Sequence, residues 1–120
     1  MIAGEEALYR IENEFPEISE KLREDEGLLH IHIGEFSHHV QSFIDNGNEN
    51  EFGRVCKLFV ELFSSASPEL ENALNVSFLE NLNFTDGKNN RSWAYSAMPP
   101  LMRKVWDEMD EYNSKLHGNR

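Results

Sequence analysis

The chain has 120 residues and a formal net charge of −11, from 22 acidic and 11 basic residues. Hydrophobic residues make up 39% of it and include eight Phe, which excludes a wholly disordered chain. The acidic balance argues against nucleic acid or an anionic membrane as the main ligand, because phosphate binding needs a basic surface. It favours a basic protein as the partner, although acidic surfaces also serve solubility alone.

Cellular location is indicated by what the sequence lacks. No apolar run reaches the roughly 18 residues of a membrane span, and no signal-peptide pattern opens the chain. Cys56 is the single cysteine, so an internal disulfide is excluded. We therefore expect a cytoplasmic protein with a single helical domain over 1–120.

The first half of the chain has helical periodicity. A helix is expected over 5–14, and Pro16 suits the first turn of a second helix that reaches about Asp25. The clearest amphipathic segment follows and ends at Asp45-Asn46-Gly47. Its apolar residues are spaced 4, 3, 4 and 3 apart: Leu29, Ile33, Phe36, Val40 and Phe43.

The next two helices form an adjacent pair. Asn48 with Glu51 three residues later is a variant of the capping box and predicts a helix through about Ala66. Ser67-Pro68 supplies an N-cap and a first-turn proline for a helix that reaches Leu82. The pair over 51–82 resembles one unit of an α-solenoid.

The last third begins with turn residues. Residues 83–98 are expected to be irregular, since Asp86-Gly87 and a polar stretch follow the preceding helix. Pro99-Pro100 then opens a final helix, and the tail after about Asn113 is expected to fray. With no alternating strand pattern, the sequence predicts an all-α fold: a single compact bundle of five or six helices.

Four histidines lie within ten residues, at His30, His32, His38 and His39. No two have the i, i+3 or i, i+4 spacing that would place both on one helix face for a shared metal ion. Solvated or half-buried histidines are therefore expected, and no metal or cofactor. A metalloprotein that uses this segment stays a third hypothesis, and protonation at about pH 6 leaves a pH-dependent role open.

Enzyme motifs are missing from the sequence. It has no phosphate-binding glycine loop, nucleophile elbow, paired CxxC or helical HExxH. Cys56 lies on an apolar helix face without a base nearby and is expected to be a small buried hydrophobe. Carboxylate pairs such as Asp107/Asp110 arise by chance in so acidic a chain. A binding role is the better expectation than an enzyme.

Four further residues are candidates for a secondary interface. Glu61 and Glu80 interrupt apolar surroundings, so each either marks the solvent face of its helix or is a partly desolvated carboxylate for a cationic group. Trp93 and Tyr95 are expected to fold the 88–95 loop onto the core, with an interface role as the alternative. Nucleic-acid stacking by this loop conflicts with the charge.

The order of several short motifs resembles that of an uncharacterised family of small helical bacterial domains. The resemblance covers about residues 15–112, and these domains are similar to the immunity proteins of polymorphic and contact-dependent toxin systems. It implies a protein that binds and blocks a cognate toxin domain. The matching motifs are Gly34-Glu35-Phe36, Val60-Glu61, Ser77-Phe78-Leu79-Glu80-Asn81-Leu82, Met98-Pro99-Pro100 and Trp106-Asp107-Glu108-Met109.

The distribution of charge suggests where a toxin would bind. Net charge is −6 over 1–26, −7 over 27–86 and +2 over 87–120. A nuclease toxin has a basic cleft, so acidic surfaces over 17–26 and 45–51 would steer it. The alternative is an acidic helical adaptor with another partner. The predicted toxin-binding residues are Glu24, Asp25, Glu26, Asp45, Glu49 and Glu51.

Overall fold

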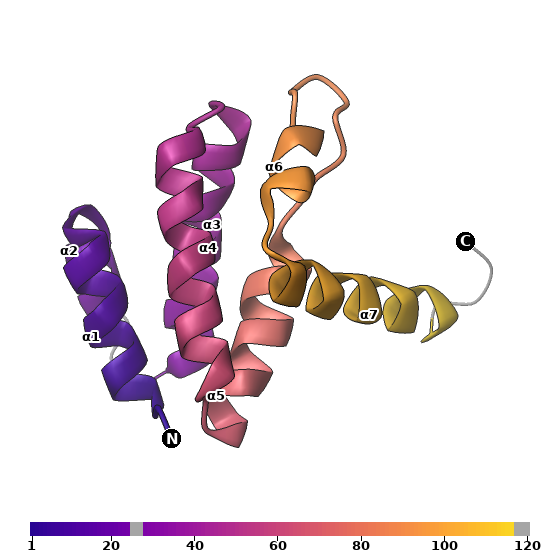
Figure 1. The fold of residues 1–120 in the computed structure, drawn as a ribbon. Coiled ribbons are helices and arrows are strands. Elements are labelled where there is room, and N and C mark those ends of the chain that lie inside the picture. Colours follow the sequence, from indigo (N-terminus) through magenta and orange to yellow (C-terminus); the bar gives the residue numbers. More distant parts are fainter. Residues whose placement is uncertain (25–27, 117–120) are drawn as a thin grey trace.

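The computed structural model describes residues 1–24 and 28–116, with the side chains of all of these except Arg23 and Glu24 (Figure 1). Within these residues the chain is helical and has no strand, apart from one isolated bridge between Ile2 and Ala66. The all-α prediction is confirmed. The helices are α1 (Gly4–Glu14), α2 (Ser19–Glu24), α3 (Leu29–Asp45), α4 (Glu49–Ser64), α5 (Pro68–Ala73), α6 (Ser92–Ala97) and α7 (Pro100–Leu116), with short turns η1 (Pro16–Ile18), η2 (Leu74–Phe78) and η3 (Leu79–Asn81).

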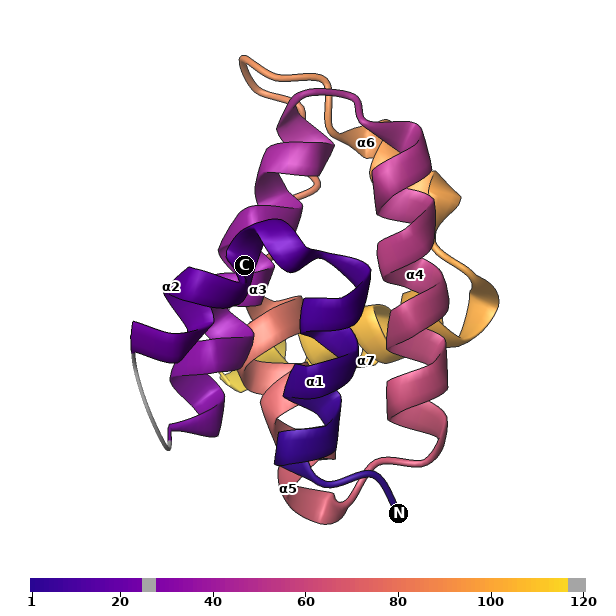
Figure 2. The same ribbon diagram turned by 90° about the vertical axis from the view of Figure 1, so that its left-hand side faces the viewer.

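The helices form layers around α3 and α4. In Figure 2, α1 lies over the space between α3 and α4, and α7 passes behind them on the opposite side. Figure 1 shows that α7 projects away from these helices, with α6 above its first turns. Among the described helices, none is both long enough and apolar enough to cross a bilayer.

Stacked phenylalanine rings hold the centre of the bundle together. The Phe78 ring lies between those of Phe36 and Phe59, at centroid distances of 5.1 and 5.8 Å. All three side chains are buried, and they come from η2, α3 and α4. Offset aromatic contacts add to the free energy gained from burying each ring, so this stack joins three segments that are distant in sequence.

The helix predicted over 68–82 is not regular. After α5 the chain widens into a π-helical turn, η2, and then tightens into the 3₁₀ turn η3. The widened turn packs mainly on α3, where the Ser37 hydroxyl donates to the Phe78 carbonyl at 2.9 Å and His30 Nδ1 lies 2.7 Å from Ser77 Oγ. The second arm of the expected pair over 51–82 therefore packs mainly on α3, and it meets α4 through the Phe59–Phe78 ring contact.

The sequence predicts a capping side chain or a turn glycine at three helix ends, and the structure confirms two of the three. Ser67 Oγ accepts from the Leu70 amide at 3.2 Å, which confirms the predicted cap. Gly47 takes a positive φ of 67° in the turn after α3. Asn48 is the N-cap residue of α4, but its side chain makes no capping hydrogen bond, so the predicted capping box is not formed.

Two predictions of where helices begin and end in the last third of the chain were wrong. Residues 92–97 form α6 within the stretch predicted to be irregular. Helix α7 continues through Leu116, beyond the expected end at Asn113, and the tail after it lies outside the described residues. Helix α6 has six residues, which is too short for a helical period to show, and Ala94 is its one buried residue.

Replacing Phe78 with alanine should lower the free energy of unfolding by about 3–5 kcal/mol, because the cavity left by the ring cannot be filled by Phe36 and Phe59. The matched control is Val76→Ala in the same π-helical turn. The Val76 side chain is 42% exposed, and its loss should cost less than about 1 kcal/mol. Urea denaturation followed by circular dichroism measures both values. Equal effects of the two substitutions would contradict a central role for the stack.

Candidate functional site

A groove separates α6 from α7 on the side of the molecule from which α7 projects. Its walls are α6, the extended segment 82–85 with η3, and one face of α7, and its volume is about 890 Å³. We call it the α6–α7 groove. The residues that give it chemical character are Glu80, Phe84, Tyr95, Trp106, Asp107 and Asp110.

One wall of the α6–α7 groove is aromatic. The rings of Phe84, Tyr95 and Trp106 pack edge to face, with centroid distances of 5.5 to 6.1 Å. Phe84 is buried, whereas Tyr95 and Trp106 are half-buried and line the groove. Because the three rings come from separate segments, their packing fixes α6 and α7 relative to each other.

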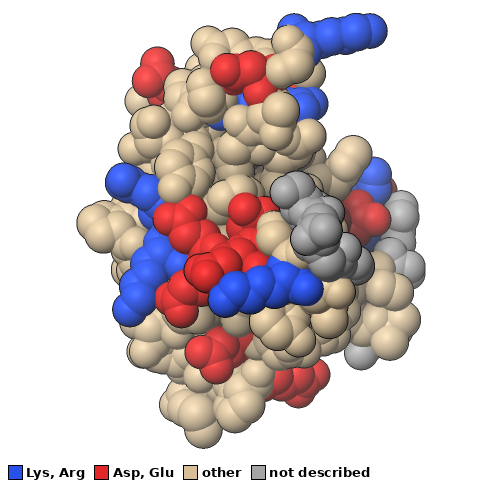
Figure 3. All heavy atoms as spheres, turned by 90° about the vertical axis from the view of Figure 1, so that its right-hand side faces the viewer, with Lys and Arg blue, Asp and Glu red and all other residues tan. Residues whose placement is uncertain are grey.

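Three carboxylates stand around this aromatic wall. Asp107 Oδ1 accepts a hydrogen bond from the Tyr95 hydroxyl at 2.7 Å, and this bond raises the pKa of Tyr95. Asn113 Nδ2 donates to Glu80 at 3.2 Å from the α7 side, and Asp110 is exposed. Within the described part of the lining there is no Lys or Arg. Figure 3 shows acidic side chains gathered in the middle of this face, with basic side chains around them.

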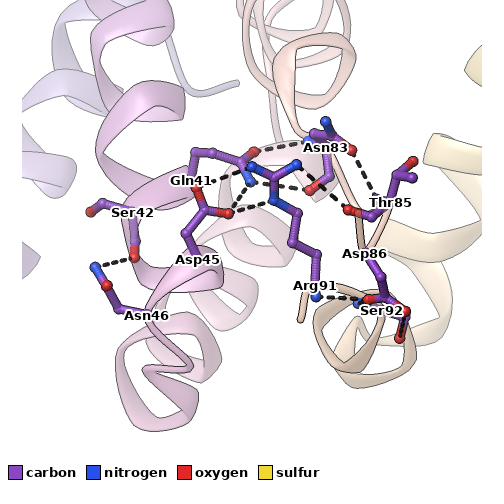
Figure 4. A network of polar contacts seen from close by, with 9 residues as sticks. All are labelled: Gln41, Ser42, Asp45, Asn46, Asn83, Thr85, Asp86, Arg91 and Ser92. Atoms are coloured by element: carbon purple, nitrogen blue, oxygen red, sulfur yellow. Dashed lines mark hydrogen bonds and ion pairs between the residues drawn. The ribbon is translucent and has the colours of Figure 1, made fainter. Parts of the chain in front are cut away.

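The position of α6 depends on a polar network that ties the 83–91 segment to α3 (Figure 4). Arg91 donates to both carboxylate oxygens of Asp45, from Nε at 2.6 Å and from Nη2 at 3.3 Å. The side-chain amide of Gln41 pairs with both backbone groups of Asn83, at 2.8 and 3.1 Å. Charge-assisted and bidentate bonds of this kind set geometry as well as energy.

Asp86 holds the start of α6. Its carboxylate accepts from the backbone amides of Arg91 and Ser92, both at 2.8 Å, and from the Ser92 hydroxyl at 3.1 Å. These bonds lower the pKa of Asp86. Because Ser92 begins the helix, Asp86 satisfies amides that would otherwise lack acceptors.

The structure describes the side chains of three of the six predicted toxin-binding residues, Asp45, Glu49 and Glu51. Asp45 is paired with Arg91, and its side chain is 29% exposed, so it is less free for a partner than expected. Asp45, Glu49 and Trp93 line a second hollow of about 410 Å³ beside the turn after α3. Glu51 is half-buried on α4 and is not among the residues that line this hollow. The Glu24 side chain, Asp25 and Glu26 lie outside the described residues.

Three of the four secondary candidates line one of the two hollows. Trp93 packs edge to face on Phe52 at 5.6 Å, as expected for a loop residue folded onto the core. Glu80 and Tyr95 line the α6–α7 groove. Glu61 is exposed on α4, which fits the solvent face of that helix.

Sequence reasoning missed Trp106, Asp107 and Asp110 as parts of one site. The net charge of +2 over 87–120 masked the local clustering of carboxylates on α7. Their i, i+3 spacing beside a tryptophan was the available signal, because it places both carboxylates on one helix face. The distant Phe84 and Tyr95 complete the site only through the tertiary fold.

The histidines do not come together. His32 is buried, with 6% of its surface exposed, where a solvated or half-buried side chain was expected, and neither ring nitrogen has a hydrogen-bond partner among the described residues. His39 Nε2 lies 2.9 Å from Glu17 Oε2, and His38 is exposed. Across residues 1–24 and 28–116, no three His, Cys, Asp or Glu side chains are placed to share a metal ion.

Cys56 is buried in the core, with 5% of its surface exposed. Burial raises the pKa of its thiol to about 12. A nucleophilic cysteine requires the thiolate, which burial disfavours here. The residue therefore packs as a small hydrophobe, in agreement with the sequence prediction.

Comparison with protein families gives one match. A family model described as a domain of unknown function (DUF7674) matches residues 9–114. The chain belongs to this family. The DUF7674 match includes every residue of the α6–α7 groove and the network that positions α6. Neither a curated protein nor a solved structure matches the chain.

The Arg91–Asp45 pair should make stability depend on pH. The hydrogen bond from Arg91 is the main cause of the lowered pKa of Asp45. The stabilisation from the ionised Asp45 carboxylate is therefore fully present above its ordinary pKa of 3.8 and is lost as the pH falls through the lowered pKa of the folded state. Asp45→Asn should therefore lower the melting temperature by a few degrees at neutral pH. The difference from the unsubstituted protein should shrink below pH 3.8.

Thermal unfolding at about pH 7 and about pH 2.5 tests this expectation. The control is Glu49→Gln, which removes a neighbouring exposed charge on α4 and should leave the melting temperature nearly unchanged. A loss in Asp45→Asn that is the same at both pH values would show that the ion pair is not its cause.

Proposed function

We propose that this DUF7674 protein is a toxin-neutralising immunity protein that acts in the cytoplasm. It binds and blocks a cognate, basic nuclease toxin domain. The observation that carries the proposal is the α6–α7 groove, in which three carboxylates surround an aromatic wall on a chain of net charge −11. The resemblance to immunity proteins of toxin systems points to the same kind of partner.

Physical complementarity supports this pairing. A nuclease must hold a polyanion, so its active cleft is basic, and an acidic surface is attracted to that cleft or its rim. Attraction of opposite charges raises the association rate and weakens with salt. Stable binding also needs packed aromatic anchors, which Tyr95 and Trp106 supply beside the carboxylates.

The groove replaces the 45–51 segment as the favoured contact surface. Asp45 already neutralises Arg91, so part of the charge expected for the partner is used inside the protein. Glu49 remains exposed and can add to the acidic field around a docked partner. Exposed carboxylates at a rim change association rates more than they change the lifetime of a complex.

Co-expression with the product of the gene immediately upstream tests the proposal, which requires that product to be the toxin. The two proteins should co-purify as a one-to-one complex, and cells that carry both should escape growth arrest. The apparent affinity should fall as salt is raised, because screening weakens the attraction. A complex without protection would favour the adaptor hypothesis, and the absence of both complex and protection would overturn the immunity proposal.

Neutralising the groove should weaken toxin binding without unfolding the protein. Asp107→Asn with Asp110→Asn should slow association by roughly threefold to tenfold at low salt, because two attractive charges are lost. Asparagine at 107 can still accept from the Tyr95 hydroxyl. Stopped-flow or surface-plasmon measurements with the toxin domain give the rate.

Two control variants separate the groove from charge elsewhere. Glu69→Gln with Glu71→Gln removes the same net charge from exposed positions on α5, outside the groove, and should have the smaller effect. Reversal of Glu24, Asp25 and Glu26 to Lys tests the N-terminal acidic segment. An N-terminal reversal that abolishes binding, with no effect of the groove substitutions, would place the contact surface there instead.

A further inference from the structure

We infer that the α6–α7 groove binds an arginine side chain of a protein partner, with its guanidinium group held between the aromatic wall and the α7 carboxylates. The inference rests on the proposed function in that it names the side chain by which a basic partner is held. The inferred site prefers a guanidinium group to an ammonium group, whereas general attraction to an acidic surface does not distinguish the two.

The carboxylates explain why the occupant is a cation. Asp107 uses one oxygen, Oδ1, for the Tyr95 hydroxyl, and Oδ2 has no hydrogen-bond or ion-pair partner among the described residues. Asp110 likewise has no hydrogen-bond or ion-pair partner within 1–24 and 28–116. Residues three apart on a helix have Cβ atoms roughly 5–6 Å apart, so these two carboxylates face the same space. Glu80 stands at the other wall.

The aromatic wall favours a guanidinium. A guanidinium is planar and weakly hydrated, and it stacks on aromatic rings while its edges donate to carboxylates. Tyr95 already takes such a contact within the protein, since Arg103 Cζ lies 6.0 Å from its ring centroid. An ammonium group is compact and strongly hydrated, and it gains less from a flat, half-exposed ring.

The groove is open enough to admit such a side chain from outside. Its volume of about 890 Å³ greatly exceeds the space one arginine needs, so a short stretch of the partner backbone can accompany it. Tyr95 and Trp106 are half-buried, whereas Phe84 lies behind them. The arginine therefore meets an aromatic wall that is held in place from the core side.

The other hollow gives an internal comparison. It contains Asp45, Glu49 and Trp93, so it also joins carboxylates to a tryptophan. There, however, Asp45 is already paired with Arg91, and the Trp93 ring packs on Phe52. A cation drawn only by overall negative charge would affect both tryptophans, whereas the inferred site affects Trp106.

Titration of the ¹⁵N-labelled full chain with three short blocked peptides tests the inference. The peptides are acetyl-Gly-Gly-Xaa-Gly-Gly-amide with arginine, lysine or citrulline at the central position. Arginine should shift the Trp106 indole resonance while leaving that of Trp93 in place, and should bind at least about fivefold more tightly than lysine. Citrulline, which keeps the shape but lacks the charge, should not bind measurably.

Matched variants connect the binding to the groove. Asp107→Asn with Asp110→Asn should weaken arginine-peptide binding at least about fivefold, whereas Glu69→Gln with Glu71→Gln should leave it within about twofold. Equal affinity for arginine and lysine, equal shifts of both tryptophans, or equal losses in the two double variants would each overturn the inference. The spectra themselves report whether a variant is folded.

The outcome is separable from that of the proposed function, because no toxin takes part in the titration. An arginine-selective groove in a protein that forms no toxin complex would overturn immunity and retain the site. A toxin complex with no arginine selectivity would retain immunity and overturn the site.

Discussion

The position of Phe78 between Phe36 and Phe59 is the constraint on which the rest of the structure depends. The stack joins η2 to α3 and α4, and the hydrogen bond from Ser37 to the Phe78 carbonyl fixes the backbone at the same point. The helix that begins at Pro68 changes from α to π geometry to reach this position and then ends in a 3₁₀ turn. The chain therefore leaves the core toward α6 and α7, and the segment that it forms there becomes a wall of the groove.

Polar contacts position the segment 83–91, which follows the packed core. Residues 83–91 bury one large apolar side chain, Phe84. The rest of their path is set by Arg91 on Asp45, by Gln41 on the backbone of Asn83, and by Asp86 at the start of α6. The Arg91–Asp45 pair is partly buried, the Asp86 bonds lie at the start of a helix, and the Gln41–Asn83 bonds are exposed. Asp45 and Asp86 therefore hold the fold together and are less available to a partner than fully exposed carboxylates. For this reason the number of acidic residues in a segment is a poor guide to the charge that it presents to a partner.

Periodicity was sufficient for the main helices because their apolar residues follow a period of 3.6. The stripe from Leu29 to Phe43 corresponds to α3, and the Ser67-Pro68 start corresponds to an observed cap. The π turn was beyond this reasoning, because an extra residue in a turn arises from packing on α3 and leaves no mark in local periodicity. Helix α6 was missed because its stability comes from Asp86 and from tertiary contacts of Trp93 and Tyr95, and not from an amphipathic pattern. The groove combines residues from 80 to 113. The sequence therefore indicated Glu80 and Tyr95 as separate candidates, but it did not indicate that they line one groove with Trp106.

The burial of Cys56 has a practical consequence for studying this molecule. Its thiol lies in the core, and burial keeps it protonated in the folded state at neutral pH. Alkylating reagents therefore reach the Cys56 thiol only when the core opens. The rate of labelling in native buffer then reports the opening of the core. Because the native thiol is protected, a cysteine introduced at the groove rim would carry a spectroscopic label without removal of the natural one. The same molecule can then report the opening of its interior through one thiol and the approach of a partner through the other.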